Sequence, residues 1–541
     1  MCPLFRGQKH NASMENQQVI RSAGIVGSCT MLSRVLGLVR DILMAAFFGT
    51  SLAMSAFVVA FTIPNLFRRL FGEGALSAAL VPVFVQTRDQ DGPEPAWALA
   101  RNILSLLTVV LSVLILVSIL GIALYLRRPD LAERTALTLP LLQVMLPYML
   151  FICLAALSMA LLNAYHHFAI PALAPSVLNV IWVLTMVLIV PWIGTSPEER
   201  IFAVAWAVLL AGVLQWAIQL PKLYQYGYRL GGSLHVRDPR VRRVFHLMGP
   251  ASLGMALTQI NALLDRLMAL AWIGPWAPAA LFFSERLIYF PQGIFATALS
   301  TVLLPVFSGH AARADHGRIR DTIQYALRNL LYVMIPASIG LWVLARPIIQ
   351  LIFEVREFGA TSSSQTAIAL MFYAPGLLVF SFGKVFVPAF YALQDTRTPV
   401  KVAACAVVLK LALSVTFILT WPLDWKHGGL ALATVIGEAF NGVVLAVLLH
   451  RRLGSPGWRR IAVSALRSLM GAACMAVATR ATWYGLAQYL VRQDWPDKAT
   501  QLASVLVAIM VGMTVYVVVT WSLRAPEIRN VVQALQRRWK K

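Results

Sequence analysis

Charged side chains lie inside two apolar stretches near the start of the chain, residues 33–48 and 56–84. A charge at the centre of a bilayer costs roughly 2.5–3.5 kcal/mol on insertion scales, so each should face a protein interior or a water-filled cavity. The planar fork of arginine matches phosphate oxygens two at a time. The excess of arginine therefore indicates that an anion, most simply a phosphate-bearing one, is bound within the membrane. The residues concerned are Arg34, Arg40, Asp41, Arg68, Arg69 and Glu73.

Their spacing predicts how these side chains are arranged. Arg34 and Asp41 lie on one stripe of a helix with Gly37, which allows another group to approach closely. Arg40 points elsewhere, toward another part of a cavity or toward the flank of Asp41. In the second stretch a proline at position 64 bends the helix or frees a carbonyl one turn before the arginine pair. Arg69 and Glu73 are four residues apart, which suits a local ion pair.

The later apolar segments carry further charges, and across the chain these intramembrane positions hold more bases than acids. One alternative is that the charges simply pair and hold the helices together, which accounts for Arg69 with Glu73. Three cations are then still left over, which favours an anion as cargo. The bases are Arg34, Arg40, Arg68, Arg69, Arg266, Arg286, Lys384 and Lys410, and the acids are Asp41, Glu73, Asp265, Glu285 and Glu438.

The elements that must position these residues are membrane-spanning helices. The chain of 541 residues is 59% hydrophobic and 13% charged, whereas soluble proteins carry about a quarter charged residues. Apolar runs long enough to cross a bilayer recur throughout and lack the two-residue alternation of barrel strands. We predict an all-α polytopic membrane protein with about fourteen transmembrane helices. They lie near 21–48, 52–87, 98–126, 136–162, 171–193, 198–221, 244–273, 276–308, 322–351, 364–393, 400–421, 428–450, 460–484 and 499–523.

An internal repeat divides these helices into two sets. ALSAALVPVF at 75–84 recurs as ALSTVLLPVF at 298–307, and DILMA at 41–45 recurs as DRLMA at 265–269. About six spans separate the copies, so both should have the same orientation and be parallel repeats. We predict two six-helix lobes around a central cavity, plus two C-terminal helices. The expected parts are a polar extension at 1–20, an N-lobe at 21–221, a basic cytoplasmic loop at 222–243, a C-lobe at 244–450, a helix pair at 451–523 and a basic tail at 524–541.

The formal net charge of +23 has an ordinary explanation in such a protein. Basic residues collect in cytoplasmic loops and set the orientation, and the basic segments at 222–243, 451–460 and 524–541 all fall on one side of the predicted topology. We therefore expect both termini in the cytoplasm, contacts with membrane lipids, and no nucleic-acid partner. We also expect a monomer.

Catalytic and metal motifs are absent from the sequence. It holds no GxSxG, HExxH or Walker loop and no aspartate-rich cluster, and its five cysteines form no CxxC pair. We therefore predict a transporter and not an enzyme, with no metal and no cofactor. Without a nucleotide site, it must be driven by the membrane potential or an ion gradient.

Several stretches resemble one known family. SRVLGLVRDILMAAFFG, AFVVAFTIPNLFRRLFGEGALSAALVPVF, FAIPALAPSVLN, ERLIYFPQGIF and FYALQDTRTPVK are similar to the MurJ/MviN lipid II flippases of the multidrug/oligosaccharidyl-lipid/polysaccharide exporter superfamily. The resemblance implies alternating-access transport of the undecaprenyl-pyrophosphate-linked peptidoglycan precursor, lipid II, from the cytoplasmic to the periplasmic leaflet of the bacterial inner membrane. It also implies that the last two helices form a groove for the lipid tail.

The resemblance also assigns roles to residues. Arginines matching Arg34, Arg40, Arg68 and Arg286 line the cavity in this family and are needed for function. We take these four, together with Ser33, as the substrate-binding residues. The supporting or gating residues are then Asp41, Arg69, Glu73, Asp265, Glu285, Lys384 and Lys410.

One position departs from some relatives, which bind sodium between an aspartate like Asp265 and polar residues of the eleventh helix. Here that helix carries Lys410 and Ser414. We predict that the ammonium of Lys410 pairs with Asp265 and replaces the sodium ion.

Other functions stay open at this point. The chain could be a flippase for another polyprenyl-linked oligosaccharide or a non-transporting membrane scaffold for wall synthesis. A drug exporter would favour cavity carboxylates, and a membrane glycosyltransferase would need an acid or metal site that the sequence does not offer.

Overall fold

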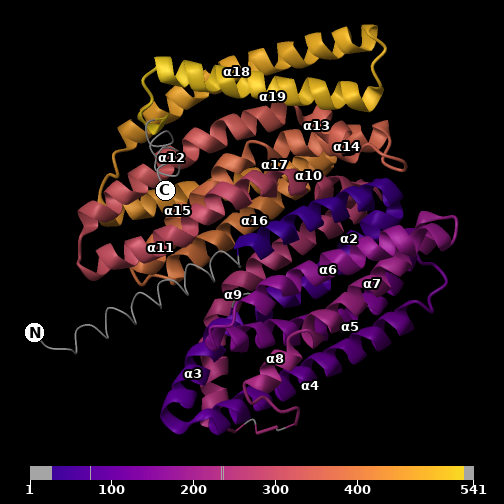
Figure 1. Cartoon of the computed structure of the whole chain (residues 1–541), viewed down its shortest axis with the longest axis vertical. Coiled ribbons are helices and arrows are strands. Elements are labelled where there is room, and N and C mark those ends of the chain that lie inside the picture. The colour runs from indigo at the N-terminus through magenta and orange to yellow at the C-terminus, as the bar shows by residue number, and fades with distance from the viewer. Residues whose placement is uncertain (1–26, 73–74, 233, 236, 529–541) are drawn as a thin grey trace, which may run out of the picture. The chain divides into compact units, whose positions relative to one another are not determined.

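The structure, a computed structural model, describes residues 27–72, 75–232, 234–235 and 237–528. Every regular element in these ranges is helical, as predicted. The chain divides into two compact units after Leu270. In Figure 1 the helices of the first unit run from indigo to magenta and those of the second from rose through orange to yellow. The division falls later than the predicted basic loop at 222–243, so the seventh predicted span belongs mostly to the first unit.

The first unit begins with a helix that the structure describes over residues 27–48, here called the first helix. The π-helical segment η3 (Ala269–Ile273) crosses the division. The elements between are α2 (Leu52–Phe67), the π-helical η1 (Arg68–Gly72), α3 (Ala75–Asp91), α4 (Pro93–Tyr125), α5 (Glu133–Ala164), α6 (Ala169–Leu188), the 3-10 turn η2 (Val190–Trp192), α7 (Pro197–Ala217), α8 (Leu220–Gln225) and α9 (Pro239–Met268).

The second unit holds the remaining helices, and its last two form an antiparallel hairpin that packs on α12. The elements are α10 (Ala277–Pro291), the π-helical η4 (Gln292–Ala296), α11 (Thr297–Ala312), α12 (His316–Val343), α13 (Ala345–Phe353), α14 (Ala360–Tyr373), α15 (Gly376–Ala392), α16 (Arg397–Thr420), the 3-10 turn η5 (Leu423–Trp425), α17 (Lys426–Leu453), α18 (Trp458–Arg492) and α19 (Asp497–Ser522).

Local sequence signals explain several helix starts. Ser51, Ser196 and Asp238 cap α2, α7 and α9, each accepting a hydrogen bond from a backbone N–H of the first turn. Proline follows directly in α7 and α9, where its missing N–H costs nothing. These caps satisfy donors that would otherwise lie unpaired at the helix ends.

Ten helices among the described residues are long and apolar enough to cross a membrane, and an eleventh results if the bent pair α14–α15 is one span. The predicted number of about fourteen is therefore not confirmed among the described residues and stays a prediction. The three remaining predicted spans are those at 21–48, 52–87 and 244–273. The first carries three charges in its described part, the last carries Asp265 and Arg266, and the span at 52–87 is broken into α2, η1 and α3. These are also the segments that hold most of the predicted anion-binding residues.

The internal repeat is visible in the backbone. The π-helical segment η1 starts at Arg68, and η4 starts at Gln292, 224 positions later. Each follows a helix of similar length, α2 or α10, and precedes the copy of the repeated sequence, in α3 or α11. A π-helical turn is rare and often marks a functional site. Two such turns at one offset support the repeat that the sequence indicates.

Candidate functional site

Arg40 lies in an ordered network inside the first unit. Its Nε and Nη2 donate to Oδ1 of Asp41 at 3.0 and 2.7 Å, and its Nη1 donates to Oδ1 of Asn179 on α6 at 2.9 Å. The guanidinium also lies over the ring of Trp182, 4.7 Å from its centre, a favourable cation–π arrangement. Of the two orientations predicted for Arg40, the structure shows the one toward the flank of Asp41.

The same network reaches Ser33, one of the predicted substrate-binding residues. The side-chain amide of Asn179 donates to the Ser33 carbonyl at 3.0 Å and lies 3.4 Å from its hydroxyl. Asn179 is also the group that approaches Gly37, where an added Cβ would lie 3.8 Å from its amide nitrogen, an ordinary contact distance. Ser33, Arg40 and Asp41 are therefore brought together by a residue from another helix.

Arg68 begins the π-helical segment η1, directly after the proline-containing helix α2. Its Nε donates to Oδ1 of Asn65 at 2.9 Å. Close by, the buried thiol of Cys153 on α5 lies 3.7 Å from the Phe67 carbonyl. The change of helical register at η1 leaves backbone carbonyls open to such side-chain partners. The arginine pair is thus carried on an irregular, polar turn of an otherwise apolar helix.

The other predicted residues of the first unit lie in different surroundings. Arg34 is exposed on the first helix, and Arg69 is exposed and donates to Oε1 of Gln259 on α9 at 3.2 Å. Asp265 is buried on α9, with 8% of its surface exposed. Glu73, the predicted partner of Arg69, lies outside the described residues. That ion pair stays a prediction.

In the second unit, Glu285 and Arg286 lie next to each other on α10. Oε1 of Glu285 accepts a hydrogen bond from the hydroxyl of Tyr373 on α14 at 3.2 Å. The Arg286 guanidinium lies 4.4 Å from the ring centre of Phe282, one turn earlier on the same helix. Both side chains are half-buried. The hydrogen bond from Tyr373 thus joins the Glu285 carboxylate to α14, and the neighbouring Arg286 guanidinium lies over the ring of Phe282.

A second group of charges lies where α15, α16 and α17 pack. Lys410 is 2% exposed and packs against Gly437, where an added Cβ would lie 3.0 Å from the lysine Cβ. Lys410 and Lys384 both interact electrostatically with Glu438, whose Oε2 accepts a 3.4 Å hydrogen bond from Asn441. Asp265, the predicted partner of Lys410, belongs to the other unit, so that pairing stays a prediction.

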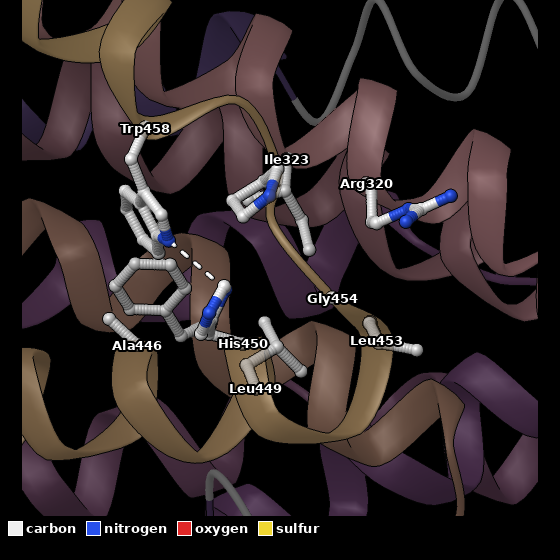
Figure 2. A pocket seen from close by; sticks show the side chains of 10 residues that line it. Arg320, Ile323, Ala446, Leu449, His450, Leu453, Gly454 and Trp458 are labelled. Atoms are coloured by element: carbon white, nitrogen blue, oxygen red, sulfur yellow. Dashed lines mark hydrogen bonds between the residues drawn. The ribbon is translucent and has the colours of Figure 1, made fainter.

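A small pocket lies where α17 ends and α18 begins. Trp458 donates to Nδ1 of His450 at 3.4 Å. Arg320 from α12 and Gly454 also line the pocket (Figure 2). The pocket contains none of the predicted substrate-binding residues. Within the described ranges, no three His, Cys, Asp or Glu side chains come together as a metal site would require.

Sequence reasoning missed Asn179 and Trp182. Both lie on one face of α6, three residues apart, and both contact the first helix: Trp182 is 3% exposed, and its indole N–H points at the sulfur of Met44 at 3.2 Å. An asparagine in an otherwise apolar span was the available signal. It lies in FAIPALAPSVLN, one of the stretches that carry the family resemblance.

Comparison with known proteins identifies the family. The model of the family described as "Lipid II flippase MurJ" matches residues 44–493. The chain belongs to this family. Its relatives include the lipid II flippase MurJ of Burkholderia cenocepacia, 34% identical over 84% of this chain and 88% of the relative. A probable lipid II flippase MurJ of Bdellovibrio bacteriovorus is 31% identical over 96% of this chain and 98% of its own length.

Solved structures show the same fold. A lipid II flippase MurJ in an inward closed conformation superposes with a TM-score of 0.75 at 23% identity, covering 93% of this chain and 99% of that one. An inward-facing multidrug resistance MATE family transporter of the MOP superfamily gives 0.65 at 14% identity, over 80% of this chain and 98% of its own. Both likenesses are to all-helical membrane proteins, and they confirm the predicted fold class.

Proposed function

We propose that this chain translocates lipid II, the undecaprenyl-pyrophosphate-linked peptidoglycan precursor, across the bacterial inner membrane. Membership of the family is the observation that carries this proposal. The site supports it through chemistry, because arginines held in or beside membrane helices offer paired N–H donors to a pyrophosphate.

The route we propose runs from the cytoplasmic to the periplasmic leaflet by alternating access. Arg34, Arg40, Arg68 and Arg286 would contact the pyrophosphate, with Ser33 beside them. Asp41 and Glu285 would hold their neighbours when no cargo is bound, as Asp41 holds Arg40 in this structure. The membrane potential or an ion gradient would drive the cycle. Both termini would lie in the cytoplasm, and the unit of function would be a monomer.

Arg40 shows how a guanidinium could change partners. Three of its five N–H groups are bonded to Asp41 and Asn179, which leaves two for another acceptor. A pyrophosphate that approached the remaining edge would add charge-assisted bonds without first breaking the existing ones. It could also displace Asp41, since both are oxyanions that accept from the same fork.

Reconstitution into proteoliposomes tests the proposal. Fluorescently labelled lipid II should move between leaflets in vesicles that contain the protein and stay in place in protein-free vesicles. Other polyprenyl pyrophosphate-linked sugars, offered in parallel, should move more slowly. Equal transport of all of them would replace lipid II by a wider class of polyprenyl-linked oligosaccharide. No transport of any would favour the scaffold alternative.

A further inference from the structure

Asn179 occupies a position that only a carboxamide can fill completely. It lies in the middle of α6 and is 6% exposed. Its Oδ1 accepts from Nη1 of Arg40 at 2.9 Å, while its Nδ2 donates to the carbonyl of Ser33 at 3.0 Å. One side chain thus meets a cation and a backbone acceptor at once. Alanine provides neither partner, and an aspartate would accept but would no longer donate.

We propose that Asn179 is a positioning residue for the anion site: it fixes the guanidinium of Arg40 and ties it to the first helix near Ser33. This inference rests on the proposed function. Asn179 acts on the cargo through Arg40, and its contribution is to hold the Nη1 end of the guanidinium in place before the cargo binds.

The surroundings of Arg40 explain why a residue from another helix is needed to position its guanidinium. Its Asp41 partner is the next residue along the same helix, so the Arg40–Asp41 contact joins two residues of one helix. Asn179 and the ring of Trp182 both come from α6 and contact the guanidinium from another direction. An arginine side chain loses considerable rotamer entropy when it is fixed. Holding it before the cargo arrives therefore removes part of the cost of binding.

Electrostatics explains why position 179 holds an asparagine and not an aspartate. An asparagine holds Arg40 without adding a second negative charge, so the guanidinium keeps more of its attraction for an anion. An aspartate at 179 would place two carboxylates on one arginine and would repel a pyrophosphate. The structure thus predicts that the isosteric change to aspartate harms binding although it retains an acceptor for Arg40.

The experiment measures lipid II affinity and thermal stability of the full-length protein purified in detergent. Asn179→Ala should weaken lipid II binding about tenfold, because a hydrogen bond to a charged group is lost. Asn179→Asp should weaken it at least as much. In an Arg40→Gln background, Asn179→Ala should cause no further loss, because the group through which it acts has gone.

Asn102 provides a matched control in the same unit. It is also buried, at 3% exposure, and also uses both ends of its amide: Nδ2 donates to the His235 carbonyl at 2.8 Å and Oδ1 accepts from the His235 N–H at 2.9 Å. None of these partners is charged. Asn102→Ala should lower the melting temperature about as much as Asn179→Ala and leave lipid II affinity unchanged.

Three results would overturn the inference: wild-type affinity in Asn179→Ala or Asn179→Asp, equal weakening in Asn102→Ala, or a further loss in the Arg40→Gln background. Absence of lipid II binding by the wild-type protein is a different outcome, and it would count against the proposed function.

Discussion

The two copies of the internal repeat share a backbone and differ in where they carry charge. In the first copy, the π-helical segment η1 itself holds Arg68 and Arg69. In the second copy, η4 holds Gln292 and Gly293 at the matching positions, and the only formal charges from α10 to α11 come earlier, at Glu285 and Arg286. The backbone break is therefore kept without its charges.

This difference indicates that the repeat supplies geometry and that each copy acquired its own polar groups. A π-helical turn opens carbonyls and widens a helix whatever side chains it carries. The charges can then lie on the turn, as in the first copy, or before it, as in the second. Functional side chains should consequently be less symmetric than the fold, and variants at matching positions should behave differently.

The largest effect is expected from Arg286→Ala. It removes the only lysine or arginine of α10, η4 and α11, whereas Arg69→Ala leaves Arg68 in the first copy. Arg286→Ala should abolish growth of a strain depleted of its lipid II flippase, while membrane levels of the protein stay normal in immunoblots. Arg318→Ala, at an exposed position paired with Asp315, is the control and should support growth. Full growth with Arg286→Ala would show that the first copy is sufficient.

The next effect concerns stability and contrasts an ion pair in each unit. Glu527, 1% exposed, accepts from Arg328 on α12 at 2.6 Å and from Ser464 on α18 at 2.8 Å, so it ties the residues after α19 to both helices. Glu527→Ala leaves the half-buried Arg328 and the buried hydroxyl of Ser464 without their common partner, and it should lower the free energy of unfolding by about 3 kcal/mol.

Denaturant unfolding in detergent, followed by circular dichroism, measures this change. The matched control in the first unit is Asp89→Ala, because the Asp89 side chain is 59% exposed and ion pairs of exposed carboxylates contribute about 0–1 kcal/mol. Similar losses in both variants would mean that the Glu527 network contributes no more to the free energy of unfolding than the Arg88–Asp89 pair.

Much of this arrangement follows from the sequence, and the exceptions have physical reasons. Sequence periodicity predicts features that depend on neighbours along the chain. These features are the helical spans, the repeat and the contact of Arg40 with Asp41. Asn179 was missed because its role exists only where α6 packs against the first helix. The span predicted as one helix at 52–87 consists of α2, η1 and α3. A π turn differs from an α turn by only one residue in its hydrogen bonding, and the pattern of apolar residues does not reveal this change.

A third prediction uses two glycines at nearly matching positions of the repeat, Gly212 on α7 and Gly437 on α17. An added Cβ at Gly212 would lie 2.5 Å from the ring of Tyr148, which is fully buried, and at Gly437 it would lie 3.0 Å from the Cβ of Lys410. Overpacking costs about 1–3 kcal/mol. Gly212→Ala should be near the upper value, and Gly437→Ala nearer the lower one.

Thermal unfolding of the two variants measures the order. Gly121→Ala is the control, because nothing lies within 4 Å of its added Cβ and alanine is the better helix former by about 1 kcal/mol. A larger loss at Gly437 than at Gly212 would reverse the comparison. It would also show that the buried Lys410 side chain is packed more tightly than Tyr148.

The smallest effect comes from two turns that match in backbone and differ in side chain. His166 and Gln394 both have positive φ, 57° and 60°. The next residue in each turn, His167 or Asp395, donates its N–H to the carbonyl five residues earlier at 3.0 Å. This is the Schellman pattern of helix ends. The turn after α5 therefore carries a histidine where the turn after α15 carries an aspartate.

Their pKa shifts have the same direction and different causes. Burial, with Lys222 nearby, lowers the pKa of His167 from its ordinary 6.5. Hydrogen bonds from Thr398, with the charge of Arg452, lower the pKa of Asp395 from 3.8. In both cases the unfolded chain binds the proton more readily, so stability falls as the pH is lowered through the ordinary value. For His167 the loss begins near pH 6.5, and for Asp395 it begins near pH 3.8.

Two variants separate these windows when melting temperature is measured against pH. His167→Gln should remove part of the loss of stability below pH 6.5, and Asp395→Asn should leave that part unchanged and flatten the profile only below pH 3.8. The informative quantity is each difference from wild type, since other histidines and carboxylates titrate in the same ranges. If His167→Gln left the profile below pH 6.5 unchanged, protonation of that histidine would not be opposed by folding, and the two turns would differ in sequence alone.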